Sequence, residues 1–196
     1  NLAVIQARMG SSRLPNKVLK DLCGKPALWH VIHRVKKSKL IDEIVIATTI
    51  EKQDLKIVKF CADNGIRVFI GSEADVLDRY YQAARLFKPD NVVRITSDCP
   101  LHDSDIIDSV IEKHIKENND YTSNTIQPTF PDGLDCEVMK YSALEKAWEN
   151  AAMISEREHV TQYLIKNDIF KKGCLKNYVN RENERWTLDT DADYGL

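Results

Sequence analysis

Short apolar runs and segments of helical periodicity alternate along the first two-thirds of the chain. Leu2 to Ile5 is an apolar run long enough for one buried strand and too short for a helix. Apolar residues at helical spacing follow, with Leu28, Ile32 and Val35 on one face of a segment that Lys25-Pro26 opens. The same alternation predicts strands at 43–49, 66–70 and 91–96 and helices at 52–63, 75–87 and 104–116. Strands and helices in turn favour an α/β fold, with a parallel sheet covered by helices on both faces.

The last third of the chain follows a different pattern. The segment 120–139 contains two prolines and two short strand-like pieces, which is consistent with a mixed edge of the sheet. Further along, helical spacing predicts helices at 141–152 and 156–166, and two short stretches at 174–179 and 185–188 are predicted as strands. No linker or low-complexity tract interrupts the chain, so we expect one domain spanning residues 1–196.

Composition and charge exclude several classes of protein. The chain is 43% hydrophobic, which suits a domain with a sizeable core, and its formal net charge is −2 with no evident basic face. We therefore expect no nucleic-acid partner. No apolar run approaches the ~20 residues that span a bilayer and no signal peptide opens the chain, so we expect a cytoplasmic protein with no membrane partner. Because the chain begins on a strand without Met, we expect that a residue or a short segment precedes it.

The cysteines, the histidines and the common catalytic motifs narrow the possibilities further. The five cysteines form no Cys-Xaa-Xaa-Cys pair, and isolated thiols are typical of a reducing compartment. The histidines form no metal-ligand set, so neither a disulfide framework nor a zinc site is predicted. The sequence also lacks the Gly-Xaa-Gly-Xaa-Xaa-Gly dinucleotide fingerprint, the P-loop and the nucleophile elbow of hydrolases.

A cationic loop follows the first predicted strand. Arg8, Arg13 and Lys17 accompany two serines and Gly10 in this loop, and open α/β sheets bind ligands at the carboxyl ends of their strands. Gly10 can adopt positive φ, and successive backbone amides can form an anion nest. Three cations suit a polyphosphate, because arginines grip phosphate oxygens bidentately. The alternative interpretation is a solvated basic loop.

Two acidic positions follow later predicted strands. Asp98 comes just beyond the strand at 91–96, and Asp189 lies at the end of the strand at 185–188. Carboxylates from two strand ends opposite a cationic loop could hold Mg²⁺ together with a nucleotide. Each has a structural alternative, because Asp98 could cap the next element and Thr190 with Asp193 resembles a capping box. Taken jointly, the three strand ends favour the metal site.

Several motifs in combination resemble those of one family. They are Ala7-Arg8-Met9-Gly10-Ser11-Ser12-Arg13-Leu14-Pro15-Asn16-Lys17, Gly24-Lys25-Pro26, Ala47-Thr48-Thr49, Gly71-Ser72 with Val76-Leu77-Asp78-Arg79, Ser97-Asp98-Cys99-Pro100 and Leu188-Asp189-Thr190. The set is similar, over essentially the whole chain, to the cytidylyltransferases that activate acidic sugars, the CMP-KDO and CMP-sialic acid synthetases. The most similar branch is the one named after spore coat polysaccharide biosynthesis protein F, by Ile5-Gln6-Ala7-Arg8, Asp75-Val76-Leu77-Asp78-Arg79-Tyr80 and Arg157-Glu158-His159-Val160-Thr161.

The resemblance implies a fold, a reaction and a cofactor. The fold would be a three-layer α/β/α nucleotidyltransferase of the Rossmann-like, GT-A-like type with a mostly parallel sheet. The reaction would be Mg²⁺-dependent transfer of CMP from CTP to an acidic or modified sugar with release of pyrophosphate, in surface or spore coat polysaccharide biosynthesis. Relatives are often homodimers. Ser97 stands where the family has glycine, and the relatives have a further helix beyond Leu196, which we expect to be missing here.

The resemblance also assigns roles to single residues. Arg13, Lys17 and Asp98 would be catalytic, and Asp98 and Asp189 would ligate magnesium. The nucleotide site would comprise Ala7, Arg8, Gly10, Ser11, Ser12, Arg13, Lys17, Asp78 and Arg79. Candidates for the sugar end of the cleft are Asp135, Glu137, Glu158 and His159, and their alternative is a structural role in strand faces and helix starts.

Two other functions stay open. A glycosyltransferase of similar fold would use a nucleotide-sugar and release a nucleoside diphosphate. An Asp-Xaa-Asp after a mid-chain strand would favour it, and Ser97-Asp98-Cys99 is not one. A non-catalytic module would bind CTP without turning it over.

Overall fold

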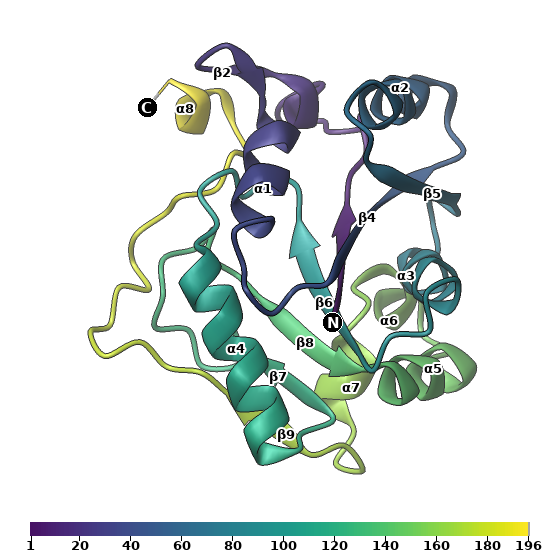
Figure 1. Ribbon diagram of the computed structural model, residues 1–196, viewed down its shortest axis with the longest axis vertical. Helices are drawn as coiled ribbons and strands as arrows, with labels where there is room; N and C mark the ends of the chain where they lie inside the picture. Colours follow the sequence, from purple (N-terminus) through teal and green to yellow (C-terminus); the bar gives the residue numbers. More distant parts are fainter. Residues whose placement is uncertain (196) are drawn as a thin grey trace.

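A seven-stranded sheet, in the order β5-β4-β1-β6-β8-β7-β9, forms the centre of the computed structural model (Figure 1). The structure describes residues 1–195, and Leu196, which the single-domain prediction included, lies outside the described residues. The strands are β1 (Leu2–Gln6), β4 (Glu43–Thr49), β5 (Arg67–Gly71), β6 (Asn91–Thr96), β7 (Tyr121–Ser123), β8 (Glu137–Lys140) and β9 (Lys172–Cys174). A separate small hairpin is formed by β2 (Asp21–Leu22) and β3 (Lys25–Pro26).

The sheet is mostly parallel, which confirms the predicted fold class. β1 pairs in parallel with β4 on one side and β6 on the other, and β5 extends this block from β4. β8 runs antiparallel between β6 and β7, while β9 pairs in parallel with β7. The carboxyl ends of β1, β4, β5 and β6 therefore lie at one edge of the sheet, where open α/β folds bind their ligands.

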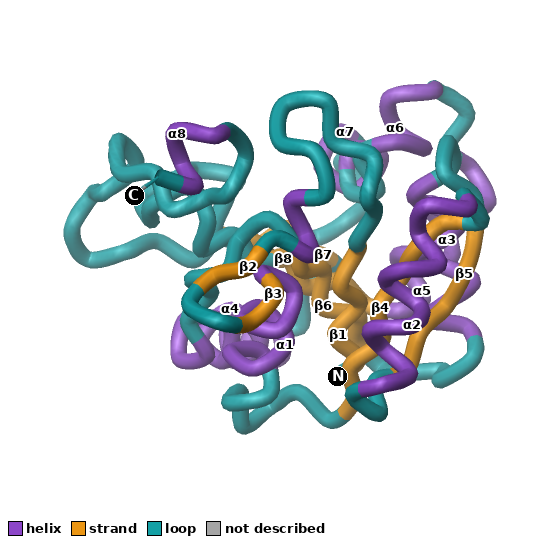
Figure 2. Tube along the Cα trace, turned by 90° about the horizontal axis from the view of Figure 1, so that it is seen from above, coloured by secondary structure: helices purple, strands orange, loops and turns teal. Residues whose placement is uncertain are grey.

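Helices cover both faces of the sheet, with α1 and α4 on one side of the strands and α3 and α5 on the other (Figure 2). Alternate residues of β1 enter two cores: Leu2 and Val4 lie with α3 and α5, whereas Ala3 and Ile5 lie with α1, α2 and α4. Successive side chains of a strand point to opposite faces, so a strand between two helical layers is apolar throughout. The helices are α1 (Ala27–Val35), α2 (Leu55–Asp63), α3 (Val76–Arg85), α4 (Ser104–Glu117), α5 (Tyr141–Asn150), α6 (Ile154–Glu158), α7 (Gln162–Lys166) and α8 (Asp191–Tyr194), with 3-10 turns at Lys17–Leu19 and Lys52–Asp54.

The helix predicted at 156–166 is wrong, because the structure has two short helices there. α6 ends at Glu158 and α7 begins at Gln162. Between them, Val160 has a φ of 58°, a left-handed conformation that interrupts an α-helix and is rare for a β-branched residue. The Val160 side chain is fully buried in the core with α3 and α5, so apolar packing holds this backbone in place.

The two strands predicted after residue 173 also differ from the structure. β9 ends at Cys174, so the strand predicted at 174–179 is displaced towards the N-terminus. The segment predicted at 185–188 forms only a single bridge, between Asp132 and Arg185. The next residue of this segment contacts the loop that contains Asp132, because the Trp186 amide donates to the Asp132 carbonyl at 2.6 Å. This segment is held by a loop instead of a strand ladder.

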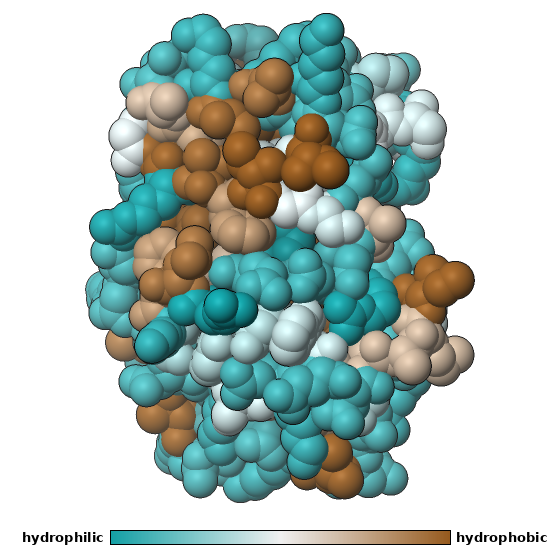
Figure 3. All heavy atoms as spheres, turned by 90° about the vertical axis from the view of Figure 1, so that its right-hand side faces the viewer, coloured by the Kyte–Doolittle hydropathy of each residue, from teal (hydrophilic) through white to brown (hydrophobic). Residues whose placement is uncertain are grey.

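β5 is one edge of the sheet and borders apolar surface. Ile70 on β5 is 43% exposed and Ile50, just after β4, is 71% exposed. Figure 3 shows apolar side chains gathered in the upper part of the face that includes α2 and β5 in Figure 1. None of the helices within residues 1–195 combines the length and the hydropathy needed to cross a membrane.

His114 on α4 is buried where this helix meets β6 and β7. Its Nδ1 lies 3.0 Å from the Thr122 hydroxyl, and its Nε2 lies 3.1 Å from the Asn91 side-chain oxygen. Burial lowers the pKa of His114 from 6.5 to about 4, and the charge of Lys140 adds to the effect. The folded protein therefore keeps this imidazole neutral at pH values where an unfolded chain protonates it.

Acidification is expected to weaken the fold through His114. Between pH 6.5 and about 4 the unfolded chain binds a proton at this residue and the folded chain does not, so stability falls as the pH drops through this window. From pH 7 to pH 5 the loss should be on the order of 1–2 kcal/mol, and His114→Gln should reduce it. Urea unfolding at the two pH values measures this difference. His33→Gln, at an exposed position of α1, should behave as wild type, and equal pH dependence in wild type and His114→Gln would contradict the assignment.

Candidate functional site

A cleft of about 730 Å³ lies at the carboxyl ends of β1 and β6. The loop after β1, the connection from β5 to α3, the turn after β6 and the end of α6 form its walls. Eleven of the residues predicted from the sequence line it: Ala7, Arg8, Gly10, Ser11, Ser12, Arg13, Lys17, Arg79, Asp98, Glu158 and His159. The structure therefore brings the cationic loop and the turn containing Asp98 to one cavity, as the strand-end argument predicts.

Buried anchors hold the loop after β1 and leave its cations at the cleft. Met9 and Leu14 are 3% and 0% exposed. The Met9 amide donates to Asp54 Oδ1 at 2.6 Å, and the buried Asp54 carboxylate also accepts from the Thr49 hydroxyl at the end of β4. The Leu14 amide donates to Ser11 Oγ at 3.2 Å. Because its apolar side chains point into the core, the loop can present polar ones to a ligand.

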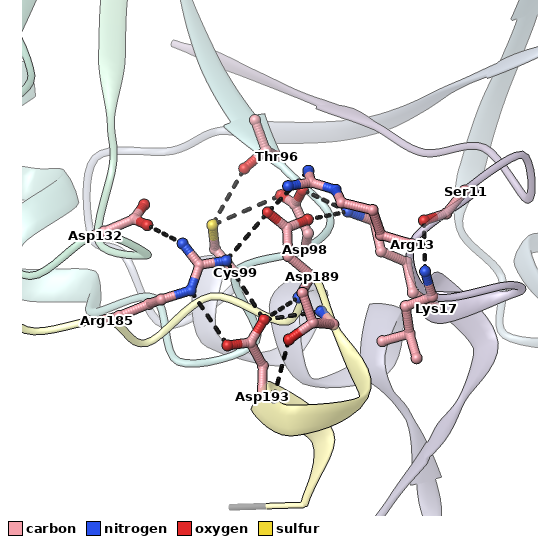
Figure 4. Close-up of polar contacts among 12 residues, drawn as sticks. Ser11, Arg13, Lys17, Thr96, Asp98, Cys99, Asp132, Arg185, Asp189 and Asp193 are labelled. Atoms are coloured by element: carbon pink, nitrogen blue, oxygen red, sulfur yellow. Dashed lines mark hydrogen bonds and ion pairs between the residues drawn. The ribbon is translucent and has the colours of Figure 1, made fainter.

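Lys17 joins the two predicted magnesium ligands (Figure 4). Its Nζ lies 2.8 Å from Asp98 Oδ2 and 2.7 Å from Asp189 Oδ1. Burial acts to lower the pKa of Lys17, but the two carboxylates outweigh it and the pKa is raised overall. Burial acts to raise the pKa of Asp98, but the charge and hydrogen bond of Lys17 outweigh it and the pKa is lowered overall. Lys17 and Asp98 are thus both charged at neutral pH.

A backbone hydrogen bond seats Asp189 beside Asp98. The Leu188 amide donates to the Asp98 carbonyl at 2.7 Å. A second close approach lies a little further along, where a Cβ on Gly133 would come within 2.7 Å of the Trp186 backbone. Gly133 also has a φ of 113°, which glycine adopts without strain. Backbone contacts therefore hold the C-terminal stretch against the carboxyl ends of the strands, and this places the Asp189 carboxylate within reach of Lys17.

The two arginines of the loop also face carboxylates. Arg13 lies 3.1 Å from Asp189 Oδ2, and Arg8 lies 3.2 Å from Glu73 Oε1. Both arginine side chains are more than half exposed, so each pair contributes little to stability. Such pairs can be exchanged for contacts with a bound anion at small cost.

Two further arginines line the cleft and are more deeply buried. Arg79 is 2% exposed and donates to the Ser72 carbonyl, while its Nε has no hydrogen-bond partner among residues 1–195. Burial lowers the pKa of Arg79. Arg94 pairs with the carboxylate of Glu137 and approaches the Gln6 side-chain oxygen at 3.4 Å. Guanidinium groups in the wall of the cleft favour a ligand that offers acceptor atoms.

Four predicted site residues, Asp78, Asp135, Glu137 and Asp189, lie outside the cleft lining as far as the described chain shows it, and Asp189 is linked to the lining through Lys17 and Arg13. Asp78 accepts from the Trp148 indole at 2.8 Å and so faces α5. Glu137 is buried against Arg94 and accepts from the Tyr121 hydroxyl at 2.6 Å. Burial, with the charges of Asp132 and Glu137, raises the pKa of Asp135 to about 6. Their roles in binding nucleotide, sugar or metal stay predictions, and Glu137 pairs with Arg94, which lines the cleft.

Sequence reasoning missed Arg94, Arg185 and Asp54. Arg94 occupies a polar position inside an otherwise apolar strand, which is a readable signal for a functional side chain. Arg185 and Asp54 owe their importance to partners distant in the sequence, and no local pattern marks them.

The Asp98 and Asp189 carboxylates fit a divalent cation. One oxygen of each contacts the same ammonium nitrogen, so a cation position already exists between them. Within residues 1–195 no group of three or more His, Cys, Asp or Glu side chains forms a complete metal cage. Mg²⁺ is often bound by one or two carboxylates with substrate phosphates and water completing its shell, and this pair matches that arrangement.

Comparisons with known proteins agree with the geometry. A family model described as Cytidylyltransferase matches residues 2–194. The spore coat polysaccharide biosynthesis protein SpsF of Bacillus subtilis is 34% identical over 201 residues, covering 98% of this chain and 82% of that protein. A cytidylyltransferase structure from Leptospira borgpetersenii superposes with a TM-score of 0.93 at 36% identity, covering 98% of this chain and 82% of that one. A CMP:2-keto-3-deoxy-manno-octonic acid synthetase complexed with CTP shares the fold, with a TM-score of 0.70 at 18% identity over 99% of this chain and 95% of that one.

The family model spans nearly the whole chain, and a relative of clear identity covers the same range. The resemblance read from the loop after β1 and from the two acidic positions is therefore confirmed. The chain belongs to the cytidylyltransferase family, a family of nucleotidyltransferases.

Proposed function

We propose that this protein transfers CMP from CTP to an acidic or modified sugar and releases pyrophosphate. The observation that carries the proposal is the Lys17 ammonium held between Asp98 and Asp189, in a cleft that Arg8 and Arg13 also line. Cations and carboxylates placed around one cavity suit a substrate that arrives as a metal-bound polyphosphate. Family membership and the CTP complex of the synthetase with the same fold support CTP as the donor.

The loop cations would hold the triphosphate. Arg8, Arg13 and Lys17 each have a carboxylate partner in the free protein, and each could exchange it for a phosphate oxygen. Arginine binds two phosphate oxygens with its planar fork, whereas lysine supplies a mobile point charge. Gly10 does not adopt a positive φ in this structure, and the Ser11 amide donates to the Met9 carbonyl at 2.9 Å, so the anion nest expected from the sequence is not preformed here.

Asp98 and Asp189 would hold Mg²⁺. When bound, the metal would neutralise phosphate charge and help to orient the triphosphate. This assignment makes both carboxylates part of the binding site and not only partners of Lys17.

The reaction needs positioning and charge neutralisation more than covalent chemistry. A sugar oxygen attacks the α-phosphorus in line, and the bond to the β-phosphate breaks as the new bond forms. Arg13 and Lys17 would neutralise the charge that develops on the departing pyrophosphate. The cleft walls would hold both substrates in register while water is largely displaced.

The remaining walls would recognise the nucleoside and the acceptor. Arg79 lines the cleft with a guanidinium, a group whose N–H donors suit the oxygen and nitrogen acceptors of a pyrimidine. Glu158 and His159 line the cleft from the end of α6 and are suited to sugar hydroxyls. The similarity to the spore coat polysaccharide biosynthesis protein SpsF supports a role in surface or spore coat polysaccharide synthesis. The cytoplasmic location and the homodimer stay predictions.

A panel of nucleotides and sugars tests the proposal directly. CTP, UTP, ATP and GTP are each incubated with Mg²⁺ and acidic or modified sugars, and pyrophosphate release and ligand-induced thermal shift are recorded. We expect pyrophosphate release with CTP that depends on both the sugar and Mg²⁺. Release of a nucleoside diphosphate from a nucleotide-sugar would instead identify a glycosyltransferase. A thermal shift with CTP and no turnover across the panel would identify a binding module.

Removing one electrostatic contact should slow the reaction sharply. Arg13→Ala and Asp98→Ala are each expected to lower kcat by on the order of 10²–10³, by analogy with the loss of one transition-state stabiliser. Steady-state pyrophosphate release measures the effect. Matched controls are Arg85→Ala on α3 and Asp63→Ala on α2, which change exposed residues of the same types and should keep wild-type rates. Unchanged turnover in either site variant would remove that residue from its proposed role.

A further inference from the structure

Arg185 contacts three carboxylates around the proposed metal site (Figure 4). One terminal nitrogen lies 2.8 Å from Asp132, the other lies 3.3 Å from Asp189 Oδ2, and Nε lies 3.2 Å from Asp193. Neither Arg185 nor Asp189 is among the residues that line the cleft in the part of the chain that the structure describes. Arg185 is linked to the cleft-lining side chains Lys17 and Arg13 through the Asp189 carboxylate that all three contact.

Asp189 has two kinds of cationic partner. Lys17 and Arg13 belong to the cleft wall and are the groups that the proposed function turns towards phosphate. Arg185 lies on the same stretch of chain as Asp189 and is not among the described residues that line the cleft. When the first two partners bind substrate, Arg185 is the partner that stays with the Asp189 carboxylate.

Two other carboxylates keep Arg185 in place. Asp132 lies on the loop that bridges to Arg185 through the backbone. Asp193 closes the capping box at the start of α8, where its Oδ2 accepts from the Asp189 amide at 2.9 Å and from the Thr190 amide at 2.8 Å. Each pair alone is weak, because the Arg185 side chain is 44% exposed, but three pairs on one planar group fix its orientation.

We propose that Arg185 is a positioning residue that orients the Asp189 carboxylate as a ligand for the divalent cation. The inference rests on the proposed function, because it takes Asp189 to be a metal ligand. Carboxylates that bind metals are commonly held by hydrogen bonds from a surrounding layer, and loss of such a partner costs about 10–100-fold in metal affinity or activity. The planar fork of arginine suits this task, since it directs several donors at fixed angles, which a lysine ammonium does not.

Metal affinity in the CTP complex tests the inference separately from turnover. Free Mn²⁺ is quantified by electron paramagnetic resonance as it is titrated into protein with saturating CTP. Pyrophosphate release against Mg²⁺ and CTP concentration is measured in parallel. For Arg185→Gln we expect about 10-fold weaker Mn²⁺ binding, roughly 10–100-fold lower kcat and a higher Mg²⁺ requirement. The KM for CTP should change by less than about threefold, because Arg185 does not line the cleft. Arg185→Lys should show most of the same loss.

Controls separate positioning from a structural role. Arg181→Gln changes an exposed arginine of the same stretch, paired with Glu184, and should keep wild-type Mn²⁺ affinity and kcat. Asp132→Asn removes the negative charge that lies 2.8 Å from Arg185 and serves if Arg185→Gln fails to fold. It should weaken Mn²⁺ binding in the same direction by about threefold, a smaller loss because one of three ion pairs is weakened to a neutral hydrogen bond.

The outcomes are distinct. Wild-type protein that binds Mn²⁺ with CTP, while Arg185→Gln or Asp132→Asn binds it equally well, would overturn the inference and leave the proposed function intact. A loss of CTP affinity and thermal stability without a selective loss of Mn²⁺ affinity would also overturn it, because that pattern marks a structural role. Wild-type protein that releases no pyrophosphate across the sugar panel would overturn the proposed function, and the Mn²⁺ titration would still decide whether Arg185 acts through Asp189.

Discussion

The bridge that Lys17 makes between Asp98 and Asp189 depends on an electrostatic constraint. Two carboxylates brought close together in a partly buried cleft repel each other, and each loses hydration. A cation between them offsets both costs, and Lys17 supplies it at 2.8 and 2.7 Å. Asp98 is placed in the cleft by the turn that follows β6. Asp189 is placed beside it by the hydrogen bond from the Leu188 amide to the Asp98 carbonyl. The positions of the loop after β1 and of the C-terminal stretch are thus coupled through one ammonium group.

The same constraint explains why the cleft carries so many charges without being strongly cationic. Lys17, Arg13 and Arg8 each face an acidic side chain in the free protein. A metal-bound polyphosphate carries both signs of charge. The cations of the loop could therefore bind phosphate oxygens while the carboxylates of Asp98 and Asp189 bind the metal. The proposed exchange would keep Lys17, Arg13 and Arg8 paired with an opposite charge in both states, which avoids leaving these ions uncompensated. Arg185 belongs to neither exchange, and this is why its contact with Asp189 can persist.

Sequence patterns predicted the parts of this site that depend on local structure. Leu2 to Ile5 is apolar because it lies between two helical layers, and its end fixes where Arg8 and Lys17 begin. Asp98 was found because it directly follows such a strand. Asp189 was predicted to follow a strand at 185–188, but this segment forms only a single bridge in the described structure. The position of Asp189 was therefore predicted for a partly wrong reason. The break between α6 and α7 at Val160 could not be predicted from the sequence, because tertiary packing holds this β-branched residue at positive φ. Arg185 and Asp54 depend on distant partners that no local period encodes.

The antiparallel pairing of β6 with β8 shapes the remaining wall of the cleft. Its register sets Arg94 directly opposite Glu137, and directly opposed residues of an antiparallel pair lie close enough to interact. Glu137 is thereby committed to Arg94 and to the Tyr121 hydroxyl. Arg94 is the member of the pair that lines the cavity. An acidic side chain predicted to meet the sugar is thus a buried counter-charge, and any influence it has on a ligand passes through the guanidinium in front of it.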